Sequence, residues 1–142
     1  SCDLAYCTSD ATFATPGVNI GLFCSTPMVA LSRKASKKHS MKMLLTGEAI
    51  NAKHAKDFGL INDFFPEKKL EKEIIKIAKI ITSKSSLVLQ IGKNAFYKQL
   101  EMPLNKAYNF TSKVMVDNMM SEDAKEGINA FFDKRSPIWK NK

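Results

Sequence analysis

The sequence predicts the mostly helical part of an α/β fold, with two short strands near its N-terminus. Residues 4–8 and 12–14 are rich in residue types that favour strands. From residue 25 onward, apolar side chains recur with helical spacing, and capping residues separate the segments. Because two isolated strands make a poor sheet, the chain is predicted to be part of a larger α/β unit whose other strands lie elsewhere.

The segment between the second strand and the first helix contains residues that interrupt regular secondary structure. Asp10 predicts a turn between the strands, and residues 15–17 (Thr-Pro-Gly) end the second one. Residues 18–24 are apolar and contain Gly21, which favours a buried loop or a close approach of backbone segments. Residues 25–27 (Ser-Thr-Pro) then predict a helix start with a hydroxyl cap and a proline in the first turn.

The next helix is expected to start after a cap at Ser36 and to stop at Gly47, a left-handed terminator. Its predicted apolar face consists of Met41, Leu44 and Leu45.

A shorter helix follows, capped by Asn51 and ended by Gly59, with Ala52 and Ala55 allowing close packing. Residues 60–65 are expected to be extended.

Amphipathic helices are predicted in the rest of the chain. They are expected to begin near Glu67, Ser85 or Ser86, Pro103 and Ser121. The first of them carries an apolar stripe of Leu70, Ile74, Ile77, Ala78 and Ile81. The last is expected to use Ile128 and Phe131 as its apolar face and to be closed by Pro137.

The composition is close to that of an average soluble globular protein. With 142 residues, of which 44% are hydrophobic, the chain is long enough for one domain with a modest core. No apolar run is long enough for a membrane span, and no secretory leader is evident. Cys2, Cys7 and Cys24 have no paired spacing and lie far from both histidines, so they predict reduced, core-filling thiols in an intracellular compartment and no metal site.

The formal net charge of +8 leaves two interpretations open. The lysines are distributed along the predicted helices, which is typical of solvated helix faces. The alternative is an anionic partner, such as nucleic acid, a membrane surface or a phosphate-bearing cofactor. A basic module that binds nucleic acid or a membrane is disfavoured, because the sequence shows no dense basic patch and no recognition helix.

Residues 44–62 (LLTGEAINAKHAKDFGLIN) are the most specific motif. Their order of helix end, Thr-Gly, capped helix and Gly-Leu-Ile resembles the signature of the enoyl-CoA hydratase/isomerase (crotonase) family. Residues 13–27 resemble that family's acyl-pocket segment, in the form found in one particular branch, and residues 126–135 resemble its C-terminal pattern. The resemblance implies an α/β crotonase-like (ClpP/crotonase) fold. Residues 1–66 would then end the crotonase core, and residues 67–142 would form a C-terminal helical region for oligomerisation and CoA contact.

The resemblance also implies which catalytic groups to expect. The family stabilises an enolate-like thioester oxygen with two backbone N–H groups, which would lie upstream of Ser1. Its hydratases place a second glutamate directly after the proline of the segment that matches residues 13–17, and here that position is Gly17. Asp10 and Glu48 are the nearest acids, but they fit a turn and a helix flank better. No catalytic residue is therefore assigned in this chain.

The remaining family-derived expectations concern ligands and partners. Acyl-pocket candidates are Pro16, Gly17, Leu22, Phe23 and Cys24. Lys134 matches a lysine that contacts CoA phosphate, although a lysine at a helix C-terminus is also favoured by the helix dipole. Met115 stands where many members carry an adenine-stacking phenylalanine, so that contact would be weaker or different.

The resemblance further implies an acyl-CoA ligand and no separate cofactor. Association as a homo-trimer or hexamer and a mitochondrial or cytoplasmic location are also expected. Two functions remain open: a divergent hydratase, isomerase or thioesterase that relies on groups outside this chain, and a non-catalytic acyl-CoA-binding or oligomerisation module.

Overall fold

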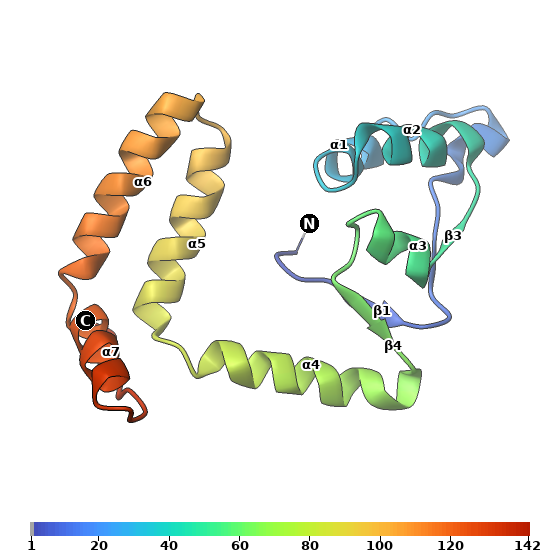
Figure 1. The fold of residues 1–142 in the computed structure, drawn as a ribbon. Coiled ribbons are helices and arrows are strands. Elements are labelled where there is room, and N and C mark those ends of the chain that lie inside the picture. Colours follow the sequence, from blue (N-terminus) through green and yellow to red (C-terminus); the bar gives the residue numbers. More distant parts are fainter. Residues whose placement is uncertain (1) are drawn as a thin grey trace. The chain divides into compact units, whose positions relative to one another are not determined.

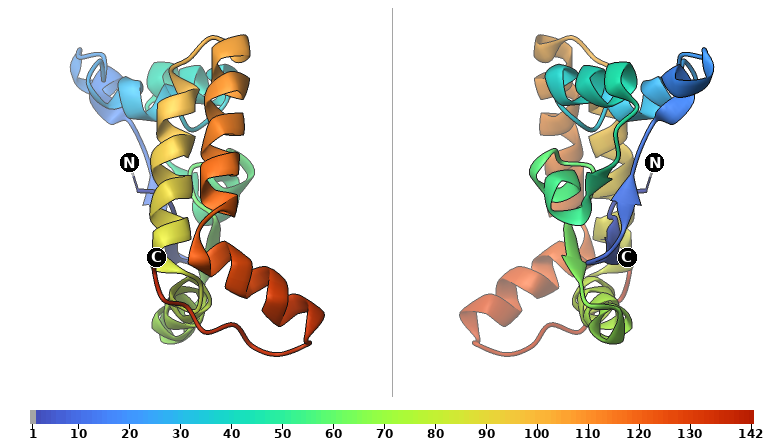
Figure 2. Two further views of the ribbon diagram at one scale, coloured as in Figure 1. Left: turned by 90° about the vertical axis from the view of Figure 1, so that its left-hand side faces the viewer. Right: turned by 90° about the vertical axis from the view of Figure 1, so that its right-hand side faces the viewer.

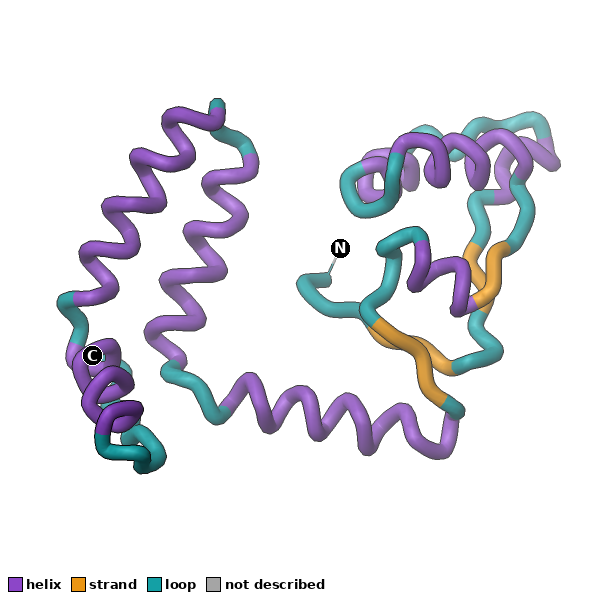
Figure 3. Tube along the Cα trace, viewed as in Figure 1, coloured by secondary structure: helices purple, strands orange, loops and turns teal. Residues whose placement is uncertain are grey.

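The computed structural model describes residues 2–142, and helices dominate it (Figures 1 and 3). The chain divides into two compact units, Ser1–Ile77 and Ala78–Lys142. Helix α4 (Glu67–Thr82) contains the boundary between them. The functional division predicted at residue 66 stays a prediction.

The first unit contains two small sheets, and three of their four strands lie where the sequence predicted extended segments; the strand at Ile50–Asn51 was not predicted. Strands β1 (Tyr6–Thr8) and β4 (Asp63–Phe65) pair in parallel, and β2 (Thr12–Phe13) and β3 (Ile50–Asn51) pair antiparallel. The parallel pair is extended by Asn62, whose side-chain Oδ1 accepts from the Ala5 N–H at 2.8 Å. The prediction of two short N-terminal strands is confirmed.

The segment after β2 differs from the prediction. A 3-10 helix, η1 (Pro16–Ile20), replaces the expected loop, and the segment is not buried: Ile20 is 76% exposed and Leu22 is 63% exposed. Gly21 has a φ of +79° but no atom within 4 Å of its Cβ position, so it supplies a turn and no close approach. The prediction of a buried loop was wrong because none of the described elements covers this side of η1.

Helices α1 (Pro27–Ser32) and α2 (Lys37–Thr46) begin and end close to the predicted positions. The hydroxyl cap predicted for α1 is absent, since the Thr26 side chain accepts no hydrogen bond and its backbone is already helical. The cap of α2 is confirmed, because Ser36 Oγ accepts from the His39 N–H at 3.3 Å.

The buried face of α2 is shifted from the predicted one. Met43 and Leu44 are each 3% exposed, whereas Met41 and Leu45 are 49% and 62% exposed. The reason is that α2 packs on the α1 side of the core, where Leu31 joins the same buried cluster.

Helix α3 (Ala52–Asp57) follows the sequence prediction closely. Asn51 Oδ1 caps it by accepting from the His54 N–H at 2.9 Å. Ala52 and Ala55 are 1% and 0% exposed, which confirms their role in close packing. Gly59, with a φ of +78°, turns the chain after α3 as expected.

The second unit contains α5 (Ser86–Leu100), α6 (Leu104–Met119) and α7 (Glu122–Phe132). Ser85 and Ser121 cap α5 and α7 through their side-chain oxygens, as predicted. Pro103 stands at the N-cap of α6 and not inside its first turn. Helices α5 and α6 run antiparallel side by side, and α7 leaves the end of α6 at an angle (Figures 1 and 2).

The buried face of α7 was also predicted wrongly. Ile128 and Phe131 are 48% and 79% exposed, whereas Asp123 and Ala130 are each 1% exposed. The cause is the C-terminal tail, residues 137–142, which folds back on α7. Its backbone N–H groups donate to the Asp123 carboxylate, at 2.7 Å from Lys140 and 3.0 Å from the residue after it. The hydrogen bonds between the tail and Asp123 therefore take the place of the expected apolar packing of Ile128 and Phe131.

The three cysteines are free thiols. Cys2 is exposed, and Cys7 and Cys24 are partly buried, so none of them is the fully buried core filler that was predicted. Burial and the neighbouring Asp10 carboxylate raise the pKa of the Cys7 thiol. This thiol is therefore protonated at neutral pH and a poor nucleophile.

Candidate functional site

The predicted acyl-pocket residues form a short loop, Gly17 to Cys24, closed on itself by two hydrogen bonds. The Gly17 N–H donates to Cys24 Sγ at 3.3 Å. The Leu22 N–H donates to the Gly17 carbonyl at 2.9 Å. We call residues 16–24, which begin with η1, the Gly17 loop. It brings Pro16, Gly17, Leu22 and Cys24 together locally, with Phe23 43% exposed.

The space beside the Gly17 Cα is filled. A Cβ atom at this position would lie 2.7 Å from the Leu22 carbonyl oxygen and 2.8 Å from Cys24 Sγ. Contacts under 3.0 Å to a backbone oxygen are severe overlaps, and the oxygen belongs to the loop backbone itself. Position 17 therefore lacks a side chain and, in this loop conformation, has no room for one.

The family-like motif at residues 44–62 positions this loop. Gly47 ends α2 with a φ of +64°, and its missing Cβ admits Val18 Cγ2 and the Asn19 amide, each about 3.0 Å from that Cβ position. Glycine is thus needed twice at position 47, for the left-handed turn and for the close approach of η1. The sequence predicted only the first reason.

The sequence offers Asp10 and Glu48 as candidates for the missing acid. Among the described residues, neither carboxylate forms a hydrogen bond with the Gly17 loop. Asp10 lies in the turn after β1, and hydrogen bonds from the Thr8 side chain and its own backbone hold its pKa below the ordinary value. A carboxyl group with a lowered pKa is a poor proton donor at neutral pH. Glu48 is exposed, and its backbone N–H donates to Thr46 Oγ1 at 3.2 Å.

A pocket of about 460 Å³ lies next to the Gly17 loop, and none of the five predicted acyl-pocket residues lines it. Its walls include Phe13, Leu31, Met43 and Leu60. Thr15 also lines it, and the Thr15 Oγ1 atom is buried without a hydrogen-bond partner among the described residues. Sequence reasoning missed Thr15, because nothing in a Thr-Pro-Gly turn shows that its hydroxyl becomes buried.

The two predicted CoA contacts lie on different helices of the second unit. Met115 is on α6 and is 61% exposed. Lys134 follows the end of α7 in a left-handed conformation with a φ of +53°, and it is exposed. No contact between the Met115 and Lys134 side chains is recorded among the described residues.

The two neighbouring cations Lys134 and Arg135 differ in their ion pairs. Arg135 forms a two-pronged ion pair with Glu126, with distances of 2.6 Å and 3.0 Å, and a further contact with Asp133. This pairing lowers the pKa of Glu126 to about 2. No ion pair of Lys134 occurs within residues 2–142. Lys134 is thus available to an anion in solution, whereas Arg135 is committed to the fold.

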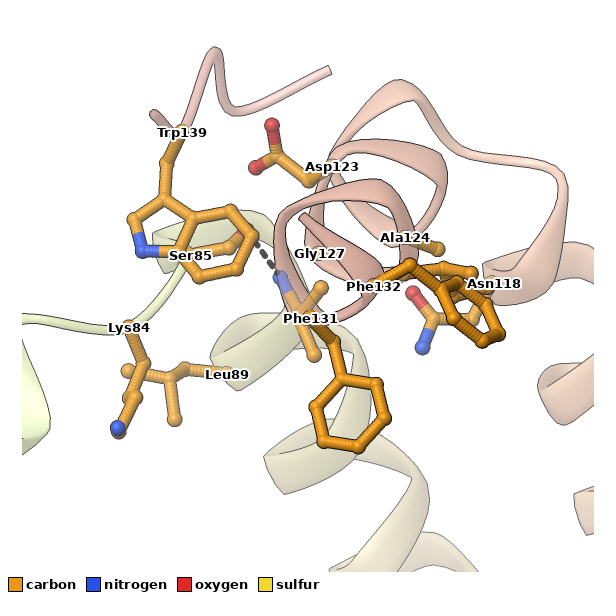
Figure 4. Close-up of a pocket in the computed structure, with 12 residues that line it drawn as sticks. Lys84, Ser85, Leu89, Asn118, Asp123, Ala124, Gly127, Phe131, Phe132 and Trp139 are labelled. Atoms are coloured by element: carbon orange, nitrogen blue, oxygen red, sulfur yellow. Dashed lines mark hydrogen bonds between the residues drawn. The ribbon is translucent and has the colours of Figure 1, made fainter. Parts of the chain in front are cut away.

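A second pocket, of about 650 Å³, lies entirely within the second unit (Figure 4). Apolar side chains of α5 and α7 form most of its wall, and Trp139 of the tail closes one side. The Trp139 indole N–H donates to the Ser83 carbonyl at 2.8 Å, and its ring packs over Gly127. We call this cavity the α7 pocket.

Residues 2–142 offer no site of two other kinds. None of the described helices has the length and apolarity needed to cross a membrane. Nor do the described His, Cys, Asp and Glu side chains gather in groups of three or more that could hold a metal ion.

Comparison with known proteins decides the family. The enoyl-CoA hydratase/isomerase family model matches residues 1–142. The chain belongs to the enoyl-CoA hydratase/isomerase family. Mitochondrial enoyl-CoA hydratase domain-containing protein 3 of Mus musculus is 52% identical over 139 residues, which are 98% of this chain and 46% of the relative. The Homo sapiens protein of the same name is 50% identical over the same shares.

Solved structures confirm the crotonase-like fold of this family member. An enoyl-CoA hydratase from Mycobacterium smegmatis matches with a TM-score of 0.93 and 45% identity, covering 97% of this chain and 54% of that one. Human enoyl-CoA hydratase domain-containing protein 3 matches with a TM-score of 0.92 and 49% identity, over 97% and 55%. The predicted branch, that of enoyl-CoA hydratase domain-containing protein 3, is confirmed as well. The chain spans about half the length of the curated relatives it matches.

Proposed function

We propose that this chain belongs to a protein that binds fatty acyl-CoA thioesters and does not use the second hydratase carboxylate of its family. The observation that carries the proposal is the filled space beside Gly17, where a Cβ would lie 2.7 Å from the Leu22 carbonyl oxygen. This loop conformation therefore leaves no room for an acidic side chain at position 17.

The chemistry explains why this position matters. Hydration of a 2-enoyl thioester requires one group to deprotonate water and a group to protonate the α-carbon. Glycine transfers no proton, and the lowered pKa of Asp10 makes that carboxyl a poor replacement. Binding of the thioester, by contrast, needs only apolar contacts and cations for the phosphates.

Lys134 is the proposed phosphate contact. It is exposed, has no ion pair within the described chain, and lies on a protein of net charge +8. The proposed homo-trimer or hexamer is supported by large apolar side chains exposed on α5 and α6. These are Phe96, Leu100, Leu104 and Tyr108, which are 55%, 57%, 75% and 69% exposed. The relatives' names support a mitochondrial location.

One experiment separates binding from turnover. The chain and its Gly17→Glu variant are incubated with crotonyl-CoA, and loss of the enoyl-thioester absorbance is followed. We expect no turnover above background for the unmodified chain, because Gly17 transfers no proton, and none for Gly17→Glu, because a glutamate has no room in the loop. Turnover by the unmodified chain would overturn the proposal that the protein works without the second hydratase carboxylate of its family.

Binding is then measured by calorimetry with CoA and octanoyl-CoA. We expect weak, salt-sensitive binding that Lys134→Ala reduces about two- to fivefold, the range for an exposed charge contact. The matched control is Lys68→Ala, an exposed lysine on α4, which should leave the affinity unchanged. Equal effects of the two substitutions would reject Lys134 as the specific contact.

A non-catalytic oligomerisation module is the second candidate, and the exposed apolar residues of α5 and α6 favour it. In that case the chain would self-associate but show no binding of CoA at any salt concentration. A sedimentation mass of a monomer, together with salt-sensitive CoA binding, would favour the acyl-CoA-binding function instead.

A further inference from the structure

Lys134 has a backbone conformation that lysine rarely adopts. Its φ is +53°, in the left-handed region where residues other than glycine are uncommon. Its N–H donates to the Phe131 carbonyl at 3.3 Å, and the next N–H, that of Arg135, donates to the Ala130 carbonyl at 3.0 Å. These two hydrogen bonds form the Schellman motif that ends many helices, and glycine usually occupies the left-handed position in it. Lysine is strained there, because its Cβ lies close to the following carbonyl oxygen.

A single carboxylate fastens the chain on the C-terminal side of Lys134. Glu126 Oε1 accepts from Arg135 Nη1 at 2.6 Å and from the Ile138 N–H at 2.9 Å, and Oε2 accepts from Arg135 Nη2 at 3.0 Å. Arg135 Nε donates to Asp133 Oδ2 at 3.2 Å. We call these four contacts the Glu126 clamp. The residues directly before and after Lys134 are thus joined to each other, and the second of them is joined to α7.

The Glu126 clamp accounts for the persistence of the left-handed lysine. A strained backbone angle persists only where the surrounding structure holds it. The Glu126 side chain is 22% exposed, and its ionised pair with Arg135 is forked, which fixes direction as well as distance. None of the hydrogen bonds of the clamp uses the Lys134 side chain, which is exposed. The clamp therefore determines where the backbone presents the Lys134 side chain.

The fold does not need a lysine at this position. The dipole of α7 favours a cation near its C-terminal end, and Arg135 already supplies one. Glycine at position 134 would remove the backbone strain. A strained residue whose side chain lies outside the ion pairs of the fold is more consistent with a binding role than with a structural one.

We propose that Glu126 is a positioning residue for the binding of phosphate by Lys134. Glu126 acts through Arg135, which holds Lys134 in the left-handed conformation and so fixes the direction of its ammonium group. This proposal rests on the phosphate contact proposed above for Lys134. It adds that an acidic side chain, which by its charge opposes an anionic ligand, increases the affinity for that ligand.

The sign of one substitution distinguishes positioning from simple electrostatics. Glu126→Gln removes a negative charge near the proposed phosphate contact, so charge alone predicts tighter binding of CoA. Positioning predicts weaker binding by about two- to fivefold, the same loss as for Lys134→Ala. Arg135→Lys keeps the cation but loses the fork, so it should weaken binding equally, and it gives the same test should Glu126→Gln not fold. The control Glu122→Gln removes an exposed acid from the same helix and should not weaken binding.

Two further measurements separate positioning from a general effect on stability. The double variant Glu126→Gln/Lys134→Ala should bind CoA no more weakly than Lys134→Ala alone, because the clamp acts only through Lys134. Lys134→Gly should raise the urea midpoint by roughly 0.2–0.8 M, whereas Lys134→Ala should leave it nearly unchanged because alanine keeps the left-handed strain. Binding is measured by calorimetry on variants that far-UV circular dichroism shows to be folded.

Three outcomes overturn the positioning role alone. One is unchanged or tighter binding of CoA by folded Glu126→Gln while Lys134→Ala binds it more weakly. A second is additive losses in the double variant. The third is an unchanged urea midpoint in Lys134→Gly, which would show that the left-handed conformation stores no strain. If the unmodified chain binds no CoA, or if Lys134→Ala binds it equally well, the phosphate contact itself fails and the positioning role fails with it.

Discussion

Replacing Gly17 by alanine introduces a methyl group into space that is already occupied. The new Cβ would lie 2.7 Å from the Leu22 carbonyl oxygen and 2.8 Å from Cys24 Sγ. The backbone of Gly17 is not in the left-handed region, so alanine meets no strain from its own φ angle. The effect of the substitution is therefore the overlap itself.

The expected magnitude combines two opposing contributions. Overpacking in a closed segment costs about 1–3 kcal/mol. Alanine also restricts the unfolded chain, which by itself stabilises the folded state by about 0.4–1 kcal/mol. We therefore expect Gly17→Ala to lower the free energy of unfolding by about 1–2 kcal/mol.

The assay is urea unfolding followed by far-UV circular dichroism. For a urea dependence of about 1–3 kcal/mol per molar, the midpoint should fall by roughly 0.5–1 M. Gly92→Ala is the matched control, because Gly92 lies inside α5 with no atom within 4 Å of its Cβ position. That substitution should raise stability by about 0.5–1 kcal/mol, the opposite sign.

Adding Cys24→Ala to Gly17→Ala should recover part of the loss. The sulfur neighbour disappears, while the Leu22 carbonyl oxygen remains 2.7 Å away. If Gly17→Ala is as stable as the unmodified chain, the loop can rearrange at little cost. A glutamate could then be accommodated at position 17, and the reasoning behind the proposed function would fail.

Two further predictions concern other parts of the chain. Gly47→Ala should destabilise the first unit by about 1–3 kcal/mol, because φ is +64° and a Cβ would lie 3.0 Å from Val18; an unchanged urea midpoint would contradict this. The hydrogen bonds from Arg135 lower the pKa of Glu126 from 4.5 to about 2. Because the ionised carboxylate is favoured in the folded state, its contribution to the free energy of unfolding is complete above pH 4.5 and is lost as the pH falls from 4.5 towards 2. The urea midpoint seen by Trp139 fluorescence should fall over this window, and less steeply in Glu126→Gln; parallel pH profiles would refute the assignment.

Local features of the fold were predictable because they depend on neighbouring residues. The caps at Ser36, Asn51, Ser85 and Ser121 each use a side-chain oxygen that reaches an N–H three residues ahead. The left-handed turn at Gly47 follows from the properties of glycine in the same way. Such features need no knowledge of the rest of the chain.

The buried faces of helices were less predictable. In α2, the predicted Leu44 is buried, but Met43 is buried in place of the predicted Met41 and Leu45. In α7, the apolar Phe131 is 79% exposed and the charged Asp123 is buried, because a tail segment docks on that face. Periodicity finds an amphipathic helix, but the partner that packs against it decides which side is covered.

The candidate site divides in the same way. The family motif and the glycine at position 17 are visible in the order of residues alone, because each depends on residue type and position. Only the tertiary structure shows that the Leu22 carbonyl oxygen and Cys24 Sγ fill the place of the missing side chain. Only the folded chain places Lys84, Asn118 and Trp139 around one pocket. These residues are far apart in sequence, and contacts of that range arise from the packing of whole helices, which no local pattern encodes.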